Sequence, residues 1–515
     1  MKTLRVCLLT GIMLCAFFFL TTTVCATEEV AQDITAQTTF SGSGYNSFRF
    51  LKDGNTEVYQ TSNGNVTITL SNPDEIGGLY LMFDQPYGEY LVTNNATGDQ
   101  YTAGYEGYLH EYIDIYGYFG GSTSLTLHFN NGAVRLSEIT VLSCAEEIPA
   151  SVQRWEYSLD GGADLVLFSS HGDDEHLYFA GLLPYYAGEK GYAVQVVYLT
   201  DHRNDTNKRV HEMLNGLWAA GVRAYPVFGE FADFRVDSLN GTYNEYANTY
   251  GTSQEELLSF VVAQIRRFRP IVAVGHDLKG EYGHGMHQVY ADLLTKAVKI
   301  SNNPDAFPES VQLYGTHEIS KLYLHLYGDN RVTMDYDTPL EAFNGMTAFE
   351  VSQKVCFPLY KTQQWPMFTE WLYGKNNEIT KASQIQTYSP TQFGLYHSTV
   401  GEDVNKNDLF ENVLTYYQQE QQEADRIEQE QQQQQQQEQD RIEQEQQEQE
   451  RLEQEEYEQQ VNAQIQEEQS KTTRTIMLLV CALVAAIVAL IAVPIVIKRY
   501  RYMRYRKQIE EQEDQ

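Results

Sequence analysis

Positive charge is scarce in this 515-residue chain, which has 36 lysines and arginines against 70 aspartates and glutamates. The formal net charge of -34 argues against a nucleic-acid-binding protein, because binding to phosphates requires basic patches. The sequence also lacks a G-x-G-x-x-G motif after its first α/β strand, so its α/β region has no signature of dinucleotide binding.

Cysteine is rare as well. Of six cysteines, three lie within the first 26 residues and one lies in an apolar run near the C-terminus. Cys144 and Cys356 remain, so at most one disulfide bond can join them. Such a bond would connect two predicted domains, and two separate buried thiols are the alternative interpretation.

The N-terminus has the pattern of a secretory signal peptide. In residues 1–26, Lys2 and Arg5 precede an apolar run that ends in a small residue, which predicts export of the mature chain. Lipid attachment at Cys25 is the alternative, although Val24 stands where such a signal has a small residue.

Residues 476–497 form an uncharged run that is long enough to cross a bilayer as a helix. Basic residues follow it directly and, by the positive-inside rule, place residues 498–515 in the cytoplasm. We therefore predict a single-pass cell-membrane protein with an extracellular ectodomain. The basic residues are Lys498, Arg499, Arg501, Arg504, Arg506 and Lys507.

Residues 416–470 are a low-complexity stretch of Gln and Glu, in which DRIEQEQQ begins at Asp425 and again at Asp440. Apolar residues are too sparse for a coiled-coil seam, so we expect a solvated helix or a disordered stalk. If fully helical, roughly 50 residues would span about 75 Å and act as a spacer.

Residues 35–145 contain short alternating runs between Gly, Asn, Asp and Pro clusters, the pattern of a β-sandwich or jelly roll. The closing run, residues 133–142, and the general layout resemble discoidin-like (galactose-binding-like) domains. Tyrosines are dense in residues 101–119, where their rings could stack on sugars. Packing inside the sandwich is the alternative.

Residues 150–400 alternate apolar strands with helical stretches, the first expected over residues 175–188, which predicts a parallel sheet and a Rossmann-like α/β fold. Two of the strands, residues 165–168 and 271–275, run directly into polar segments, HGDDEH and HDLKGEYGHGMH. The carboxyl ends of parallel strands meet at the edge where α/β proteins bind ligands. Two such loops can supply the three nitrogen or oxygen ligands of a catalytic zinc ion.

The segments HGDDE, which begins at His171, and YGHGMH, which begins at Tyr282, resemble the two motifs of the PIG-L/LmbE-like zinc-dependent N-deacetylases. Both occur in the family's order and at a similar separation, within a resemblance that covers roughly residues 163–360. It implies hydrolysis of the acetamide of an N-acetylated amino sugar with Zn²⁺ or another divalent cation. The implied metal ligands are His171, Asp174 and His287.

The resemblance also implies roles for residues beside the metal. Asp173 corresponds to the general base, and His284 corresponds to a histidine that stabilises the developing oxyanion with support from Tyr282. Arg209 is a candidate substrate-binding residue, with a surface salt bridge as the alternative interpretation.

Two positions depart from the family motifs. Gly172 replaces a proline, and Met286 replaces an aspartate that orients the catalytic histidine. Asp277 or Glu281 could orient His284 instead.

We therefore predict a membrane-anchored, extracellular N-deacetylase that acts on a GlcNAc-type glycan or glycoconjugate. The alternative is a non-catalytic surface glycan-binding protein with a degenerate deacetylase fold. Release of acetate separates the two hypotheses.

Overall fold

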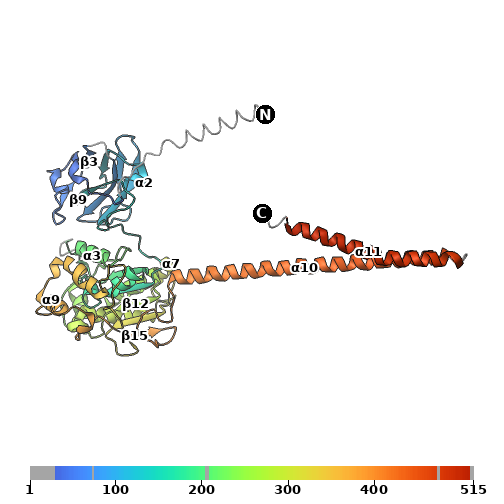
Figure 1. Cartoon of the computed structure of the whole chain (residues 1–515). Coiled ribbons are helices and arrows are strands. Elements are labelled where there is room, and N and C mark those ends of the chain that lie inside the picture. The colour runs from blue at the N-terminus through green and yellow to red at the C-terminus, as the bar shows by residue number, and fades with distance from the viewer. Residues whose placement is uncertain (1–28, 72–74, 203–207, 472–475, 511–515) are drawn as a thin grey trace. The chain divides into compact units, whose positions relative to one another are not determined.

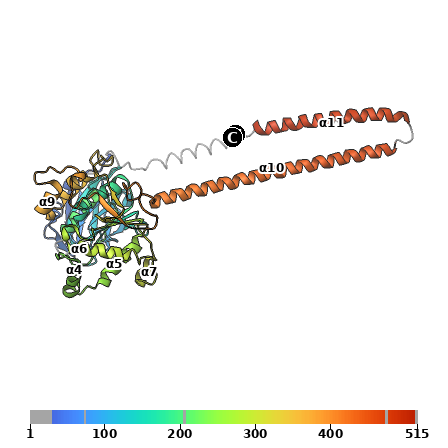
Figure 2. The same ribbon diagram turned by 90° about the horizontal axis from the view of Figure 1, so that it is seen from below.

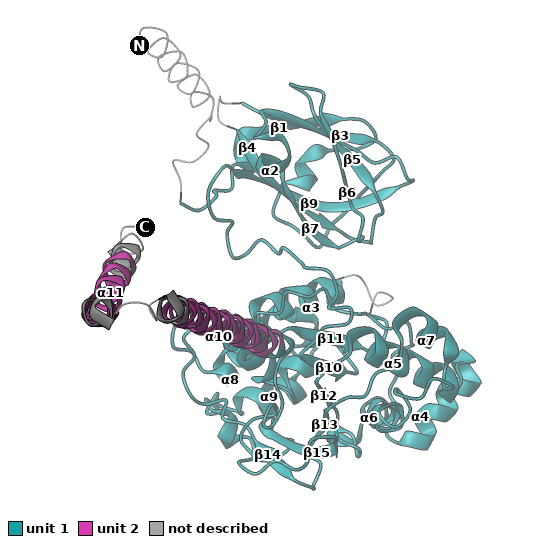
Figure 3. Ribbon diagram, turned by 90° about the vertical axis from the view of Figure 1, so that its right-hand side faces the viewer, with its two compact units in different colours: residues 1–419 teal, residues 420–515 magenta. Residues whose placement is uncertain are grey.

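The computed structural model describes residues 29–71, 75–202, 208–471 and 476–510. The predicted signal peptide lies outside these residues. The chain divides into two compact units, residues 1–419 and 420–515, coloured separately in Figure 3. The first unit contains a β-rich domain followed by an α/β domain, which confirms the predicted multidomain organisation.

The β-rich domain, blue in Figure 1, consists of two antiparallel sheets with the strand orders β1-β3-β8-β5-β6 and β2-β9-β4-β7. Alternate side chains of β3, such as Val66 and Ile68, are buried, because successive residues of a strand point to opposite faces. The strands are β1 (Thr38–Gly42), β2 (Gln60–Ser62), β3 (Asn65–Leu70), β4 (Ile76–Phe83), β5 (Tyr90–Asn94), β6 (Gln100–Ala103), β7 (His110–Asp114), β8 (Ser124–His128) and β9 (Val134–Ser143), with the short helix α2 (Ile115–Phe119) between β7 and β8.

Partly buried aromatic side chains and buried histidines connect the β-rich domain to the α/β domain. Tyr108 stacks on Tyr225 with ring centroids 4.3 Å apart. His110 lies between Tyr80 and His211: its Nδ1 is 2.7 Å from the Tyr80 hydroxyl and its Nε2 is 2.7 Å from His211 Nδ1. Burial lowers the pKa of His211 to about 4 and the pKa of His110 well below its usual value. Both imidazoles are therefore neutral at pH 7.

We expect the free energy of unfolding to fall as the pH drops from about 6.5 to 4. In this range His211 binds a proton in the unfolded chain but stays neutral in the folded protein. The free energy of unfolding therefore falls by about 3 kcal/mol. The test is the pH dependence of unfolding in the parent and in His211→Asn, whose amide oxygen can replace Nδ1 as an acceptor. Equal pH dependence in both proteins would contradict the prediction.

The α/β domain is built on a six-stranded sheet with the order β11-β10-β12-β13-β15-β14. The first four of these strands are parallel, whereas β15 is antiparallel to β13 and to β14. Residues of β10 alternate between two hydrophobic cores, Leu165 and Leu167 in one and Val166 and Phe168 in the other. The bounds are β10 (Leu165–Ser169), β11 (Val194–Tyr198), β12 (Val272–Gly275), β13 (Lys321–His325), β14 (Arg331–Thr333) and β15 (Gln392–Ser398).

Helices cover both faces of this sheet. Figure 3 shows α4 to α7 on one side and α3, α8 and α9 on the other, and Figure 2 shows α4 to α7 together from below. In α5, Ser253 and Glu256 form a capping box, which explains why the helix begins there. The bounds are α3 (Lys208–Ala219), α4 (Leu239–Glu245), α5 (Gln254–Phe268), α6 (Gly285–Ala297), α7 (Pro308–Tyr314), α8 (Ala348–Glu350) and α9 (Pro366–Tyr373).

Two expectations from the sequence need correction. Residues 175–188 do not form one regular helix, because Gly181 has a φ of 99° and Pro184 follows it. Instead, a 3-10 turn forms at Asp174–His176, and Leu182 and Leu183 lead into a π-helical turn at Pro184–Glu189. A bond between Cys144 and Cys356 is excluded, since Cys144 is disulfide-bonded while Cys356 is a free, buried thiol.

The C-terminal part of the chain consists of two long helices. The helix α10 (Tyr416–Lys471) is 56 residues long and carries intrahelical ion pairs from Arg426, Arg441 and Arg451 to nearby glutamates. Its first turn is fixed to the α/β domain, because the Asp164 carboxylate accepts a hydrogen bond from the Tyr416 amide at 2.7 Å. The helix α11 (Ile476–Glu510) contains a candidate membrane span, Ala482–Arg504.

Candidate active site

The loops after β10 and β12 bring the predicted ligands together. Parallel pairing of Leu165 with Val272 aligns the two strands, so both end at the same edge of the sheet. The loop after β10 is closed by the Asp174 carboxylate, which accepts a hydrogen bond from the His171 amide at 3.1 Å. His287 lies in the first turn of α6, which begins after the second loop.

Three candidate ligand atoms converge at this edge. His171 Nδ1 is 3.1 Å from Asp174 Oδ2 and 3.2 Å from His287 Nε2, and His287 Nε2 is 3.3 Å from Asp174 Oδ2. Ligands about 2.0–2.1 Å from one tetrahedral zinc ion lie about 3.3 Å from each other. Two imidazole nitrogens and a carboxylate oxygen at these separations fit a divalent ion such as zinc.

Glu281 organises the histidines behind these ligands. Its fully buried carboxylate accepts hydrogen bonds from His287 Nδ1 at 2.7 Å, from His276 Nδ1 at 2.9 Å and from His325 Nδ1 at 2.6 Å. Burial alone would raise the pKa of Glu281, but the imidazoles hold that pKa well below its usual range. With its Nδ1 proton bound to Glu281, His287 keeps the lone pair of Nε2 available for a metal.

His276 also lies near Asp174 and His287, in a group with the spacing of metal ligands. Its Nε2 accepts a hydrogen bond from the Ser170 amide at 2.9 Å, and its Nδ1 donates to Glu281. Both ring nitrogens are therefore engaged, so His276 supports the site without being a ligand.

Asp173 lies beside the three ligands and is held by a different group. Its Oδ2 is 3.4 Å from an Arg209 nitrogen, and Arg209 Nε donates to the Gly172 carbonyl at 2.7 Å. Burial raises the pKa of Asp173 to about 6, although the positive charge of Arg209 opposes the shift. Arg209 is itself buried and braces this loop, so its salt bridge with Asp173 is internal and does not lie at the surface.

His284 presents a hydrogen-bond donor next to the ligands. Its Nδ1 accepts a hydrogen bond from the Met286 amide at 3.3 Å, which leaves the proton of the neutral ring on Nε2. Burial, together with His171 and His287, lowers the pKa of His284 to about 2. The Tyr282 ring is 5.3 Å from the His284 ring, on a backbone with a φ of 46°, a strained conformation that costs of order 1–3 kcal/mol.

Comparison with known proteins assigns this region to a family. Residues 166–298 match the family described as PIG-L: GlcNAc-PI de-N-acetylase. Residues 166–298 are a PIG-L domain. The matched segment contains both motif loops and the three candidate ligand residues His171, Asp174 and His287.

Two curated relatives carry the same description, 1D-myo-inositol 2-acetamido-2-deoxy-alpha-D-glucopyranoside deacetylase. The protein from Streptomyces avermitilis is 27% identical over 178 residues, which are 31% of this chain and 60% of the relative. The protein from Mycobacterium leprae is 29% identical over 157 residues, 27% of this chain and 50% of the relative. The chain thus spans 50–60% of the length of these relatives.

Two solved structures were also matched. N,N'-diacetylchitobiose deacetylase from Pyrococcus horikoshii aligns at 15% identity and a TM-score of 0.31, over 45% of this chain and 84% of that one. The family 32 CBM from C. perfringens NanJ, in complex with galactose, aligns at 10% identity and a TM-score of 0.19, over 22% of this chain and 99% of that one.

Both departures from the family motifs have structural explanations in this PIG-L domain. The Gly172 amide donates to His202 Nε2 at 3.0 Å, a bond that a proline could not make. A Cβ at Gly172 would lie 2.3 Å from the Met213 sulfur. The Met286 side chain is buried in a hydrophobic core, and the Met286 backbone amide contacts His284 in place of a side chain.

The sequence did not identify one acid of the PIG-L domain site. Asp233 Oδ1 lies 3.3 Å from His171 Nε2, so Asp233 can fix the ring whose Nδ1 faces the ligand cluster. The neighbouring Phe231 forms an isolated parallel bridge with Thr200, which brings this segment to the same sheet edge. The only feature of the sequence that pointed to Asp233 was its position a few residues after the short apolar run 224–228.

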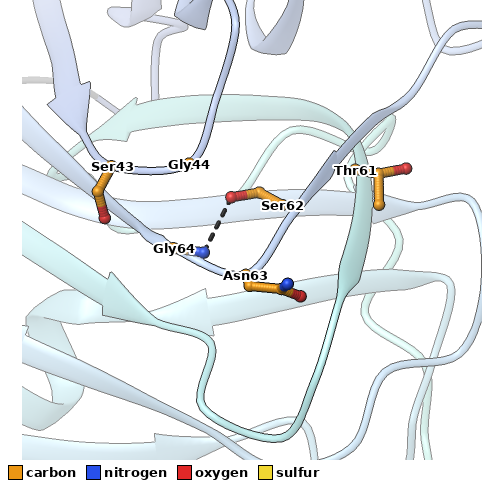
Figure 4. A pocket seen from close by; sticks show the side chains of 6 residues that line it. All are labelled: Ser43, Gly44, Thr61, Ser62, Asn63 and Gly64. Carbon is orange, nitrogen blue, oxygen red and sulfur yellow. Dashed lines mark hydrogen bonds between the residues drawn. The ribbon is translucent and has the colours of Figure 1, made fainter.

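The β-rich domain contains a separate surface pocket, drawn in Figure 4. It has a volume of about 340 Å³, and the Gly64 amide donates to the Ser62 hydroxyl at 2.9 Å within it. Its lining residues carry no titratable side chain, so this pocket offers no acid, base or charged metal ligand. They are Ser43, Gly44, Thr61, Ser62, Asn63 and Gly64.

We expect Glu281→Gln to weaken zinc binding by roughly 10–100-fold, because an amide is a poorer acceptor for the three imidazoles than a carboxylate. A competition titration with a chromophoric chelator measures the affinity. Glu212→Gln is the matched control, since the Glu212 carboxylate is also buried but binds Thr362. Equal affinities in the parent and Glu281→Gln would contradict this role of Glu281.

Proposed function

We propose that this protein is a zinc-dependent N-deacetylase that hydrolyses the acetamide of an N-acetylated amino sugar in a GlcNAc-type glycan or glycoconjugate. The observation that carries the proposal is the convergence of His171 Nδ1, Asp174 Oδ2 and His287 Nε2 within 3.3 Å of each other. The relatives that match the PIG-L domain are named as deacetylases of a 2-acetamido sugar, which supports the same reaction class.

A divalent ion held by these three residues would supply Lewis acidity for the attack of water on the amide carbonyl. Asp173 then accepts the proton of the attacking water and passes it to the departing amine. The positive charge of Arg209, 3.4 Å from Asp173 Oδ2, favours the ionised carboxylate, which can act as the base. The products are acetate and a free amino sugar.

His284 is placed to stabilise the negative charge that develops on the carbonyl oxygen. Because its Nδ1 accepts the Met286 amide hydrogen, its Nε2–H can donate to that oxygen. Tyr282 packs against both His284 and His287 and limits their movement. Arg209 holds Asp173, and we propose that any contact between Arg209 and the substrate is made through the same buried guanidinium.

We propose that the reaction takes place outside the cell, on a protein anchored by the candidate span Ala482–Arg504. Basic residues at the C-terminal end of this helix support a cytoplasmic tail. In the β-rich domain, Tyr105, Tyr116 and Tyr118 are 62%, 42% and 51% exposed, which supports sugar binding at this surface.

The decisive experiment combines metal analysis with an assay for acetate. The zinc-loaded full chain is incubated with N-acetylglucosamine and its oligomers, and we expect stoichiometric release of acetate. Bound zinc without acetate release from any of these sugars would overturn the proposal and favour a non-catalytic glycan-binding protein.

A further inference from the structure

An aromatic cluster adjoins the metal ligands on the side of α9. Tyr178 lies four residues after the ligand Asp174, and its ring is 5.8 Å from the ring of His287. On its other sides, Tyr178 is 5.2 Å from Trp371 in α9 and 6.2 Å from Tyr388. The cluster therefore begins at the ligands and extends away from them into a part of the chain beyond the matched family segment.

Two observations indicate that the cluster is held in a fixed form. Trp371 Nε1 donates a hydrogen bond to the Thr387 carbonyl at 2.9 Å, which ties α9 to the loop that carries Tyr388. Tyr388 itself has a φ of 54°, a left-handed conformation that bulky residues rarely adopt. Strained residues of this kind cluster at ligand-binding sites, where the surrounding structure enforces them.

The burial of the rings changes across the cluster. Tyr178 is buried beside the ligands, whereas Trp371 and Tyr388 are partly exposed. An aromatic surface that starts at the reacting centre and becomes accessible farther away fits a substrate that continues beyond its reacting group. Faces of Tyr and Trp rings bind apolar surfaces while their polar atoms remain hydrated, a combination that suits the C–H face of a pyranose ring.

We propose that Tyr178, Trp371 and Tyr388 form a sugar-stacking subsite for the ring next to the N-acetylated sugar. This inference rests on the proposed deacetylase function and narrows its substrate to oligosaccharides of two or more rings. The three side chains of the subsite are uncharged aromatic groups, which suits a neutral neighbouring sugar ring.

The test compares kcat/KM for N-acetylglucosamine and for its trimer in the zinc-loaded full chain. We expect the parent to prefer the trimer by at least about tenfold, and Trp371→Leu to lose most of this preference. Trp365→Leu is the matched control, because Trp365 lies at the start of the same helix, is 60% exposed and makes none of the described ring contacts with the cluster. An unchanged preference in Trp371→Leu, or no preference in the parent, would overturn the subsite.

A second variant keeps the subsite testable if Trp371→Leu does not fold. Tyr388→Gly removes the ring at a position where glycine relieves backbone strain, so its fold is expected to be retained. Calorimetric binding of the monomer and trimer provides a readout without turnover. If no sugar releases acetate, the proposed function fails. The subsite is still supported if Trp371→Leu and Tyr388→Gly each weaken binding of the trimer about tenfold. If these variants instead change the preferred length of the N-acyl group, the cluster binds the acyl chain and the inference is wrong.

Discussion

Asp173→Asn is expected to reduce kcat by roughly 10²–10⁴-fold while leaving zinc binding unchanged. The asparagine can keep a contact with Arg209 but cannot accept a proton from water, and Asp173 is not one of the three converging ligands. The measurements are kcat for acetate release and the zinc content of the purified variant.

Asp277→Asn serves as the matched control for Asp173→Asn. Asp277 lies in the second motif loop and accepts a hydrogen bond from the Lys279 amide at 3.2 Å, so its replacement removes a carboxylate close to the site without altering the proposed base. If Asp173→Asn retained the parent's activity, the assignment of the base would be wrong. If it lost its zinc, Asp173 would be a ligand.

Gly172→Pro is expected to lower activity by about 100-fold, although it restores the proline of the family motif. Proline lacks the amide hydrogen that binds His202, and its Cβ would lie 2.3 Å from the Met213 sulfur in a filled space. Both effects move the loop between His171 and Asp174, where a displacement of about 1 Å costs about 10²-fold in rate. Acetate release and zinc affinity measured on the same sample report the change.

Two further variants separate the causes of this loss. Gly172→Ala retains the amide hydrogen but adds the Cβ, so it should be impaired less than Gly172→Pro. Adding Met213→Ala to Gly172→Ala opens space for the Cβ and should recover much of the activity. A fully active Gly172→Pro would show that neither the His202 bond nor the Met213 contact positions the loop.

The sequence predicted the convergence at the sheet edge because the residues concerned follow strands directly. His171 and Asp174 come just after an apolar run, and His287 lies shortly after a second run. Parallel pairing of two such strands brings their ends together whatever the intervening residues are, so a local pattern was sufficient for a prediction about distant residues.

The orientation of the side chains could not be predicted in the same way. Asp277 and Glu281 were candidates to orient His284, but Glu281 binds His287, and a backbone amide orients His284. Backbone hydrogen bonds depend on the path of the chain and leave no trace in residue types. Asp233 was missed for a related reason, since an isolated bridge, without a periodic strand, places its segment beside Thr200.

The first turn of α10 is held against the α/β domain at the start of its central strand. The Asp164 carboxylate joins the first turn of α10 to the start of β10 and also accepts a hydrogen bond from the Ala193 amide at 2.9 Å. His171 follows the opposite end of β10, about 17 Å away for five residues of strand. If the candidate span anchors the chain as we propose, part of any tension along α10 reaches β10 and β11 through Asp164, at the opposite end of β10 from the loop that carries His171.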